Sequence, residues 1–220
     1  MLIDPFLDAI RPHLNFDEVK VIVDIGSRDL EQSKEFKSVF PNATVYAFEA
    51  NPESYASCKA NAPEGIEVFP YALLDYDGET TFYAVKQTDN KGASSIFEPT
   101  EHVVGVDPYH GMEKIKVQAR RFDTWAKEHG ITQVDLAWVD VQGAEIPVFK
   151  GMGEILSTVK AIATEVETGA LYFPNKSYKP AQYKELSDFL SLREFKEILY
   201  HQPWPLEADV VFLNKNHEKR

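Results

Sequence analysis

The sequence predicts an α/β protein with a doubly wound, mostly parallel sheet whose C-terminal edge is an antiparallel hairpin. Apolar runs rich in β-branched residues occur at residues 19–24, 44–48 and 134–141, and such runs are typical of strands buried on both faces of a parallel sheet. Segments in which apolar residues recur at helical spacing separate the runs, so strands and helices alternate along the chain. The last two runs, at residues 197–200 and 208–213, have no helix between them, which predicts a terminal hairpin.

The first third of the chain carries clear helix and strand signals. A short amphipathic helix is expected after Pro5. Asn51, Pro52 and Glu53 combine an N-cap residue, a proline at the first helical position and an acid in the first turn, which predicts the start of another helix. Residues 66–73 then predict the third strand.

The pattern changes at about residues 74–121. Alternating polar and apolar residues at 80–85 and 114–119 predict an antiparallel pair of strands. Between them lie residues 86–113, which are rich in Gly, Pro, Asp and His, and a loop of that length in a compact domain is usually a functional lid or disordered. We therefore expect residues 1–220 to form one domain with an inserted hairpin and lid.

Regular alternation returns after the insertion. The remaining predicted elements are a helix at 122–129, a strand at 134–141, a helix at 147–156, a strand at 160–166 and an amphipathic helix at 180–192, followed by the terminal hairpin.

Composition excludes several classes of protein. The 220 residues are 44% hydrophobic and 26% charged, which is typical of a globular domain and not of a disordered or fibrous chain. The 23 basic and 35 acidic residues give a net charge of −12, and no Lys/Arg stripe with interleaved aromatic residues offsets it. Because so acidic a chain repels phosphate groups, we expect neither nucleic acid nor an anionic membrane surface as a partner.

Two further features predict a cytoplasmic location. The single cysteine, Cys58, cannot form an internal disulfide, so a reducing compartment is the default. The N-terminal segment carries Asp4 and Asp8 where a signal peptide has basic residues, and its apolar runs are too short for a membrane span.

Candidate ligand-binding residues follow from the predicted sheet, because ligands of open α/β sheets bind at the carboxyl ends of the strands. Gly26 ends the first strand, and a glycine there lets the backbone approach a ligand closely. The dinucleotide pattern GxGxxG is absent, which disfavours pyrophosphate binding. Glu49 ends the second strand about 20 residues later, where an acid can accept hydrogen bonds from both hydroxyls of a ribose. The alternatives are a tight turn in which Asp24 binds nearby backbone N–H groups, and a solvated Glu49 paired with a lysine.

A second group of polar residues follows the strand at 134–141. Asp140, Gln142 and Glu145 place two carboxylates and an amide at its carboxyl end. Such groups orient a cationic ligand, hold a metal or act as a base with a raised pKa. Glu145 also has a simpler explanation, since acids are favoured at helix N-termini.

In order and spacing, these motifs resemble the FkbM family of S-adenosylmethionine-dependent methyltransferases. The resemblance spans about residues 19–167 and depends on the segments at 23–27, 46–52, 72–78, 92–96, 140–145 and 148–151.

The resemblance implies a class I methyltransferase fold, which is Rossmann-like, and S-adenosylmethionine as the cofactor. The methionine end of the cofactor would lie near the first strand and its ribose on Glu49. The residues expected at the cofactor are Asp24, Gly26, Ser27, Arg28, Glu49, Ala50, Asn51, Ala72, Asp140 and Gln142.

Known acceptors of the family are hydroxyls of sugars and complex natural products, so the resemblance implies O-methylation of a small-molecule hydroxyl. Methyl transfer from a sulfonium requires alignment of the acceptor, and an alcohol must also lose its proton to a base or near a metal. Asp140 and Glu165 are the candidate bases or metal ligands, and His110 on the lid is a second candidate base.

Three further residues are candidates for contact with the acceptor or the cofactor. Ser94 and Ser95 match the family pattern on the lid, and their alternative is an ordinary turn. Tyr172 follows the fifth strand, where an aromatic side chain either walls a sugar site or simply packs. We expect specificity to reside in the lid and in residues 169–180.

The chain departs from the family at two positions. Leu30 stands where members often carry a second glycine, which suggests a different loop path, and Gln142 stands where the family usually has an acid. Some related O-methyltransferases bind Mg²⁺ with oxygen ligands at the place of Asp140 and Glu165. The sequence contains no HExxH motif or other pair of histidines at zinc-ligand spacing, so we do not expect a zinc site.

Two other functions stay open at the level of sequence. One is a nicotinamide-dependent oxidoreductase on a similar sheet. The other is a Rossmann-like protein that binds the cofactor, or a different ligand, without turnover.

Overall fold

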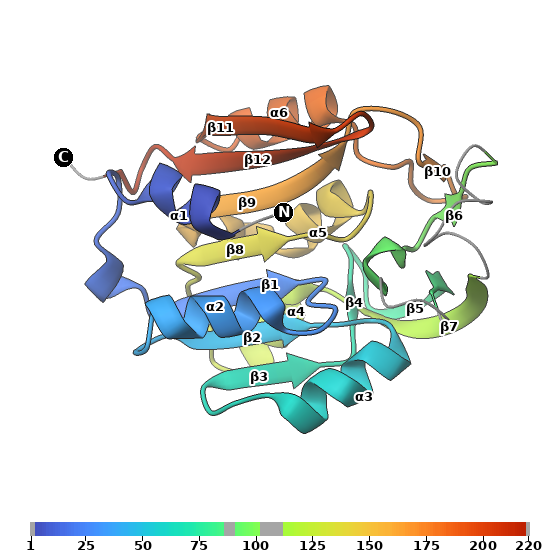
Figure 1. The fold of residues 1–220 in the computed structure, drawn as a ribbon, viewed down its shortest axis with the longest axis horizontal. Coiled ribbons are helices and arrows are strands. Elements are labelled where there is room, and N and C mark those ends of the chain that lie inside the picture. The colour runs from blue at the N-terminus through green and yellow to red at the C-terminus, as the bar shows by residue number, and fades with distance from the viewer. Residues whose placement is uncertain (1–2, 86–90, 102–111, 219–220) are drawn as a thin grey trace.

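The computed structural model describes residues 3–85, 91–101 and 112–218, and within them a seven-stranded sheet forms the centre of the fold (Figure 1). Its strands are β1 (Val21–Ile25), β2 (Thr44–Phe48), β3 (Ile66–Phe69), β8 (Leu136–Val139), β9 (Ala161–Glu167), β11 (Phe195–Trp204) and β12 (Glu207–Asn214).

The strand order is β11-β12-β9-β8-β1-β2-β3. Strands β3, β2, β1, β8 and β9 run parallel, while β12 pairs antiparallel with both β9 and β11. The predicted doubly wound sheet with an antiparallel C-terminal edge is thus confirmed. The chain continues from β1 to β2 on one side and reaches β8 on the other, so the switch in strand order lies between β1 and β8, where ligands bind in such sheets.

Helices cover both faces of the sheet. Those on one face are α1 (Ile3–Ile10), α2 (Glu31–Val39) and α3 (Pro52–Asn61), and those on the other are α4 (Phe122–Glu128), α5 (Glu145–Gly151) and α6 (Tyr183–Ser191). Phe36 and Cys58 pack in the first layer, and Trp125 and Phe149 pack in the second, all of them buried. Asn51 caps α3 as predicted, because its side chain accepts a hydrogen bond from the Glu53 N–H.

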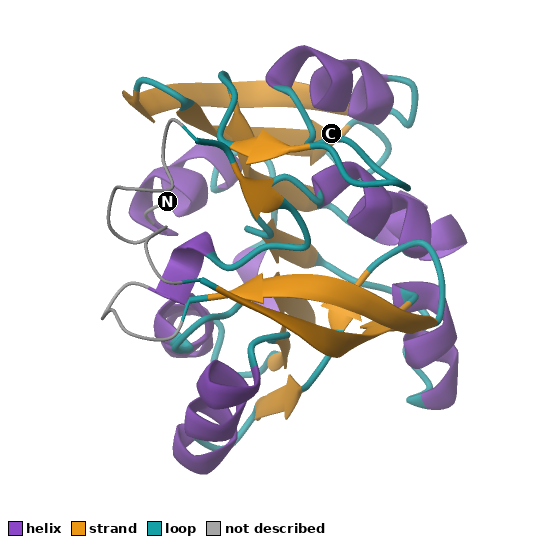
Figure 2. Cartoon of the chain, turned by 90° about the vertical axis from the view of Figure 1, so that its right-hand side faces the viewer, coloured by secondary structure: helices purple, strands orange, loops and turns teal. Residues whose placement is uncertain are grey.

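Two strands of the predicted insertion, β5 (Gly78–Ala84) and β7 (Glu113–Arg120), form a second, three-stranded sheet with β4 (Ala72–Leu73), which directly precedes the insertion. Strands β5 and β7 pair antiparallel, as the sequence predicts. This sheet lies beyond the arrowheads of β1 and β8 in Figure 1 and crosses the front of the molecule in Figure 2, so it covers the carboxyl ends of the main sheet. A short bridge between β6 (Glu98–Pro99) and β10 (Tyr172–Phe173) adds to the same side.

Three predicted elements differ from those in the structure. The strand expected at residues 66–73 is two strands, β3 and β4, because Pro70 lacks a backbone N–H and β4 leaves the main sheet to pair with β7. The helix expected at 147–156 begins at Glu145 and gives way to the 3₁₀ helix η3 (Gly153–Thr158) at Gly153, which has a φ of +56°. Helix α1 starts before Pro5, which lies in its first turn, where its missing N–H costs nothing.

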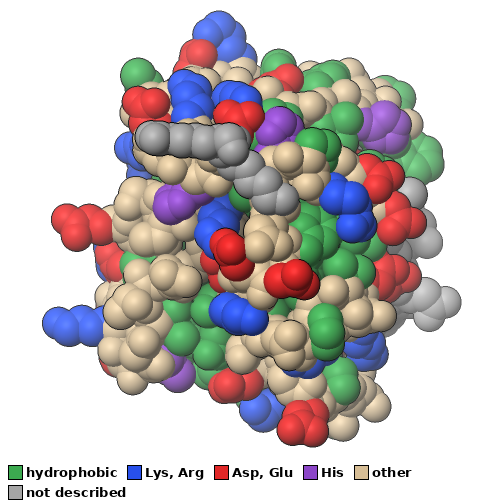
Figure 3. Space-filling view, turned by 90° about the vertical axis from the view of Figure 1, so that its left-hand side faces the viewer, with side chains coloured by type: hydrophobic (Ala, Val, Ile, Leu, Met, Phe, Trp, Pro, Cys, Tyr) green, Lys and Arg blue, Asp and Glu red, His purple; other side chains and the backbone are tan. Residues whose placement is uncertain are grey.

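The opposite end of the molecule, at the amino ends of the parallel strands, has a mixed surface. Figure 3 shows acidic and basic side chains interspersed with apolar ones on this face. Among the described residues, no helix is long and apolar enough to cross a membrane.

Candidate active site

The turn after β1 brings two strand ends into close contact. Gly26 has a φ of +89°, a conformation that favours glycine, and its N–H donates to the Phe48 carbonyl at 2.9 Å. A Cβ at Gly26 would lie 1.9 Å from the Asp140 carbonyl oxygen. The predicted close approach at this glycine is therefore made by the end of β8, and it holds the loops after β1 and β8 together.

The loop after Gly26 keeps left-handed backbone at non-glycine residues. Arg28 has a φ of +47°, and Leu30, which stands where the family often has glycine, has a φ of +66°. Left-handed backbone costs a residue with a side chain about 1–2 kcal/mol. Leu30 is fully buried, and we infer that burial of its side chain offsets this cost.

Glu49 is buried directly after β2 and faces this loop. Its Oε2 accepts a hydrogen bond of 2.7 Å from the Arg28 N–H, and its Oε1 accepts one of 2.6 Å from the Asn51 N–H. Burial raises the pKa of Glu49 to about 7, although these two hydrogen bonds lower it. Each oxygen retains a second lone pair for a ligand hydroxyl.

Asp24 lies one residue before the end of β1 and faces α2. Its Oδ2 accepts a hydrogen bond from the Ser33 hydroxyl, and its Oδ1 is buried without a protein partner. Burial raises the pKa of Asp24 to about 7. Because successive strand residues point to opposite faces, Ile25 lines the cavity described below and Asp24 does not.

Asp140 and Glu165 stand at the ends of the neighbouring strands β8 and β9, and Gln142 joins them. The Gln142 Nε2 donates to Asp140 Oδ1 at 2.9 Å and to Glu165 Oε2 at 2.8 Å. The pKa of Glu165 is raised well above its usual value, first by burial and then by the charge of Asp140. Of the three residues expected to gather after β8, Asp140 and Gln142 lie together, and the amide links Asp140 to Glu165 and not to Glu145.

Glu145 and Glu167 form a separate buried acidic pair beside Gly143. Glu145 Oε1 accepts a hydrogen bond of 3.1 Å from the Gly143 N–H, while Glu145 Oε2 and Glu167 Oε1 are buried without protein partners. Burial raises the pKa of Glu145 to about 8 and that of Glu167 to about 7. These acids are not part of the cavity wall described next.

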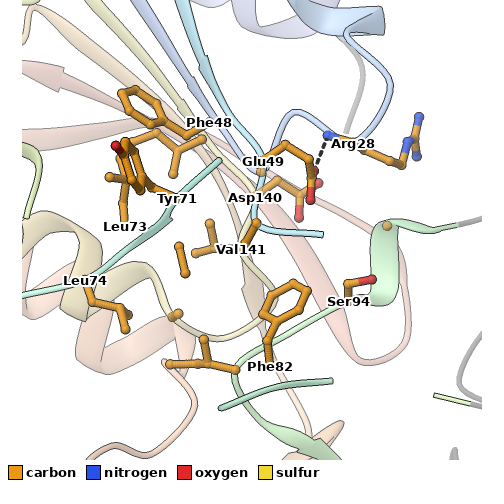
Figure 4. A pocket seen from close by; sticks show the side chains of 17 residues that line it. Arg28, Phe48, Glu49, Tyr71, Leu73, Leu74, Phe82, Ser94, Asp140 and Val141 are labelled. Carbon is orange, nitrogen blue, oxygen red and sulfur yellow. Dashed lines mark hydrogen bonds between the residues drawn. The ribbon is translucent and has the colours of Figure 1, made fainter. Parts of the chain in front are cut away.

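A cavity with about 530 Å³ of empty space, part of it open to solvent, lies at the carboxyl ends of β1, β2 and β8. Figure 4 shows the side chains of Glu49 and Asp140 on one side of the cavity and the rings of Phe48 and Tyr71 on another. Phe82 of β5 faces the same space from the inserted sheet, so the cavity has an acidic edge and an apolar wall.

A second, more acidic cavity adjoins the first. The two share Gly26, Arg28, Gly92 and Asp140 in their walls. The second cavity is also lined by Glu31 and Glu35 from the start of α2, and burial raises the pKa of Glu35.

The structure brings together about half of the residues predicted at the cofactor. Those that line the first cavity are Gly26, Arg28, Glu49, Ala50, Ala72 and Asp140, together with the lid residue Ser94. Asp24, Ser27, Asn51 and Gln142 do not line it, although Asn51 and Gln142 hold residues that do. His110 lies outside the described residues.

The other predicted contact residues connect the lid to the loop after β8. The Ser95 hydroxyl donates to the Gln142 carbonyl at 2.7 Å, and the Tyr172 hydroxyl lies 2.9 Å from Gln142 Oε1. The Ser94 hydroxyl accepts from the Val85 N–H at 3.1 Å. Ser95 and Tyr172 are buried, so they position the loop and do not present a free surface.

Comparison with known proteins identifies the family. A family model described as a methyltransferase FkbM domain matches residues 22–199, which is most of the chain. The chain belongs to the FkbM methyltransferase family. It is a methyltransferase that depends on S-adenosylmethionine.

A curated relative is similar to this chain over most of its length. The 2-O-methyltransferase NoeI of Sinorhizobium fredii is 31% identical over 202 residues, which cover 88% of this chain and 79% of NoeI.

Solved structures confirm the class I methyltransferase fold. The crystal structure of a methyltransferase FkbM from Methylobacillus flagellatus superposes with a TM-score of 0.57 at 13% identity, covering 90% of this chain and 44% of that one. TrmK of M. capricolum, in complex with S-adenosyl-homocysteine, has a TM-score of 0.53 at 10% identity and covers 100% of this chain and 71% of TrmK. This chain thus spans less than half the length of the crystallised FkbM protein.

Several residues that line the two cavities were not predicted from the sequence. Phe82 reaches the cavity only because the inserted sheet folds over the strand ends. Glu31 and Glu35 are four residues apart at the start of α2, so both lie on one face of the helix. That spacing in the sequence could have indicated that the two acids line the same site.

Proposed function

We propose that the chain transfers the methyl group of S-adenosylmethionine to a hydroxyl of a sugar or another small natural product. The observation that carries the proposal is that Glu49 and Asp140 both line the cavity beside Gly26. An acid for a ribose and an acid for an acceptor proton thus lie on the two sides of the switch point between β1 and β8.

The two adjoining cavities suit the two ends of the cofactor. The apolar wall of Phe48 and Tyr71 suits an adenine ring, and Glu49 would accept hydrogen bonds from the ribose hydroxyls. The acidic cavity with Glu31 and Glu35 would hold the methionine end, whose ammonium group is cationic. The apolar and acidic residues that line the two cavities therefore support binding of the adenosine end in the first cavity and the methionine end in the second.

When bound, S-adenosylmethionine supplies an electrophilic methyl group on a positively charged sulfur. The chain has to align the acceptor oxygen with that methyl group and accept the acceptor's proton. Asp140 is the proposed base, because it lines both cavities and Gln142 fixes its Oδ1.

A groove next to the first cavity offers a path for the acceptor. Ile96 lines both spaces, and the groove has about 1340 Å³ of empty space, part of it open to solvent. Tyr83 of β5 and Phe173, which is 45% exposed, both line it. Aromatic faces among polar side chains suit a sugar ring, which has both apolar and hydroxyl-bearing surfaces.

The groove joins the two segments that the sequence marks for specificity. The Asn175 Nδ2 donates to the Ile96 carbonyl at 3.4 Å, and the Tyr178 hydroxyl donates to Asp75. The loop after β10 is therefore fixed against the insertion. The activity of NoeI, a 2-O-methyltransferase, adds support for a hydroxyl acceptor.

The proposal is tested by methyl transfer from radiolabelled S-adenosylmethionine to a panel of pyranosides and hydroxylated aglycones. We expect label in at least one O-methyl product and loss of that product in Asp140→Asn. Cofactor binding without transfer to any hydroxyl compound, or transfer only to amines or thiols, would contradict the proposal.

A further inference from the structure

The carboxylates of Asp140 and Glu165 are joined by a single neutral side chain. Both hydrogens of the Gln142 Nε2 have a carboxylate oxygen within 2.9 Å, Asp140 Oδ1 on one side and Glu165 Oε2 on the other. Gln142 therefore supplies each of the two adjacent carboxyl groups with a hydrogen-bond donor, although its side chain carries no charge.

The orientation of this amide follows from its surroundings. Its Oε1 lies 2.9 Å from the hydroxyl of Tyr172, and the backbone carbonyl of Gln142 accepts from the Ser95 hydroxyl at 2.7 Å. A rotation of the amide by half a turn would place its oxygen against two carboxylate oxygens. The N–H groups consequently face the acids.

This arrangement does not fit the magnesium site expected from related O-methyltransferases. Magnesium requires close oxygen ligands in near-octahedral geometry, and an N–H group directed at the same carboxylates repels a cation. Within residues 3–85, 91–101 and 112–218, no group of three or more His, Cys, Asp or Glu side chains is arranged to hold a metal ion.

We propose that Gln142 takes the position that a divalent cation would need between Asp140 and Glu165, so that methyl transfer by this chain requires no bound metal. The inference rests on the proposed function, in which Asp140 faces the acceptor. It assigns Gln142, which departs from the acid usual in the family, as a positioning residue for Asp140.

The chemical step then balances without a Lewis acid. The Asp140 carboxylate takes the hydroxyl proton while the acceptor oxygen forms its bond to the methyl carbon. The carbon–sulfur bond breaks, and its electron pair stays on sulfur, which becomes neutral. One positive charge on sulfur and one negative charge on Asp140 disappear together, and Gln142 holds the carboxylate in line throughout.

The test compares the wild type with Gln142→Glu, which has the same shape but puts a third carboxylate between those of Asp140 and Glu165. Gln118→Glu on the exposed face of β7 is the matched control, because it adds the same charge away from the site. Melting temperature and calorimetric binding are measured with Mg²⁺ and with Mn²⁺ at millimolar concentration, each against EDTA. Methyl transfer is measured under the same conditions.

We expect the wild type and Gln118→Glu to bind neither metal and to keep full activity in EDTA. We expect Gln142→Glu to be destabilised in EDTA and to gain several degrees of melting temperature with either metal. If Gln142→Glu fails to fold, Gln142→Ala, which leaves two acids with room between them, should show the same metal response.

Magnesium binding by the wild type, or loss of its activity in EDTA with recovery on adding Mg²⁺, would overturn the inference. The inference would also be overturned if Gln142→Glu and Gln142→Ala both fold but neither binds Mg²⁺ or Mn²⁺. That result would show that the Gln142 amide is not what excludes the cation. Binding of S-adenosyl-homocysteine is measured in parallel. Its absence from the wild type would instead count against the proposed function.

Discussion

The Arg28 N–H donates a hydrogen bond of 2.7 Å to Glu49 Oε2, so the loop after β1 and the acid after β2 form one rigid unit. The Asn51 N–H holds the other oxygen of the same carboxylate. A ligand hydroxyl that binds Glu49 therefore meets a carboxylate whose position is already fixed, and little ordering is left to oppose binding.

The contact between Gly26 and Asp140 predicts a large and specific loss of stability. In Gly26→Ala, the new Cβ would lie 1.9 Å from the Asp140 carbonyl oxygen, and alanine would also be strained at a φ of +89°. We expect the free energy of unfolding to fall by about 3 kcal/mol or more in urea titrations.

Gly130→Ala is the control for backbone strain alone. Gly130 has a φ of +71°, but a Cβ there would meet nothing within 4 Å. Its loss should be about 1 kcal/mol. Equal losses in the two variants would mean that the loops after β1 and β8 are not in contact.

The buried acids predict that the unliganded protein becomes less stable as pH rises from about 5 to 8. The folded-state pKa is raised to about 7 for Asp24, Glu49 and Glu167 and to about 8 for Glu145, whereas the unfolded chain loses these protons nearer pH 4 to 4.5. Over this window the folded state holds more protons than the unfolded state, so raising the pH favours unfolding.

The variant Glu145→Gln tests the contribution of one of these acids. It should raise the free energy of unfolding by about 2 kcal/mol at pH 8 relative to the wild type and change it little at pH 5. Denaturant titrations at both pH values measure the difference. A wild type whose stability stays constant from pH 5 to 8 would show that Glu145 and its neighbours are ionised in the folded state.

The groove predicts a substitution that affects the acceptor alone. Phe173→Ala removes a partly exposed ring, so we expect it to change the stability of the fold little. We expect KM for a sugar acceptor to increase by about fivefold, with kcat nearly unchanged, because the ring lines the groove. Leu192→Ala, at a side chain 84% exposed after α6, is the control and should change neither value. If Phe173→Ala leaves KM unchanged, the acceptor lies elsewhere.

The sequence was sufficient for the main sheet and for the acids at its edge. The apolar runs gave the central strands, and Glu49 and Asp140 were found because polar residues directly after buried strands gather at one edge. Asp24 was expected at the cofactor, whereas in the structure it faces α2 and Ile25 lines the cavity, because successive strand residues point to opposite faces.

Other features depend on tertiary contacts that local patterns do not encode. Strand β4 is two residues long, and its pairing with β7 is a tertiary contact that takes it away from β3 and the main sheet. Phe82 has the pattern of any half-buried strand residue, and it becomes part of the cavity because of where the inserted sheet lies. Gln142 looks like a lost acid in sequence, whereas the structure shows an amide that joins two acids.

The central claim is that the cavity beside Glu49 binds the cofactor through that carboxylate. The most direct measurement is calorimetric titration of S-adenosyl-homocysteine into the wild type, Glu49→Gln and the exposed control Glu67→Gln on β3. We expect one site in the wild type and in Glu67→Gln, and affinity weaker by about tenfold to a hundredfold in Glu49→Gln, because two charge-assisted hydrogen bonds to the ribose are weakened. Equal affinity in all three proteins, or no binding to the wild type, would contradict the claim.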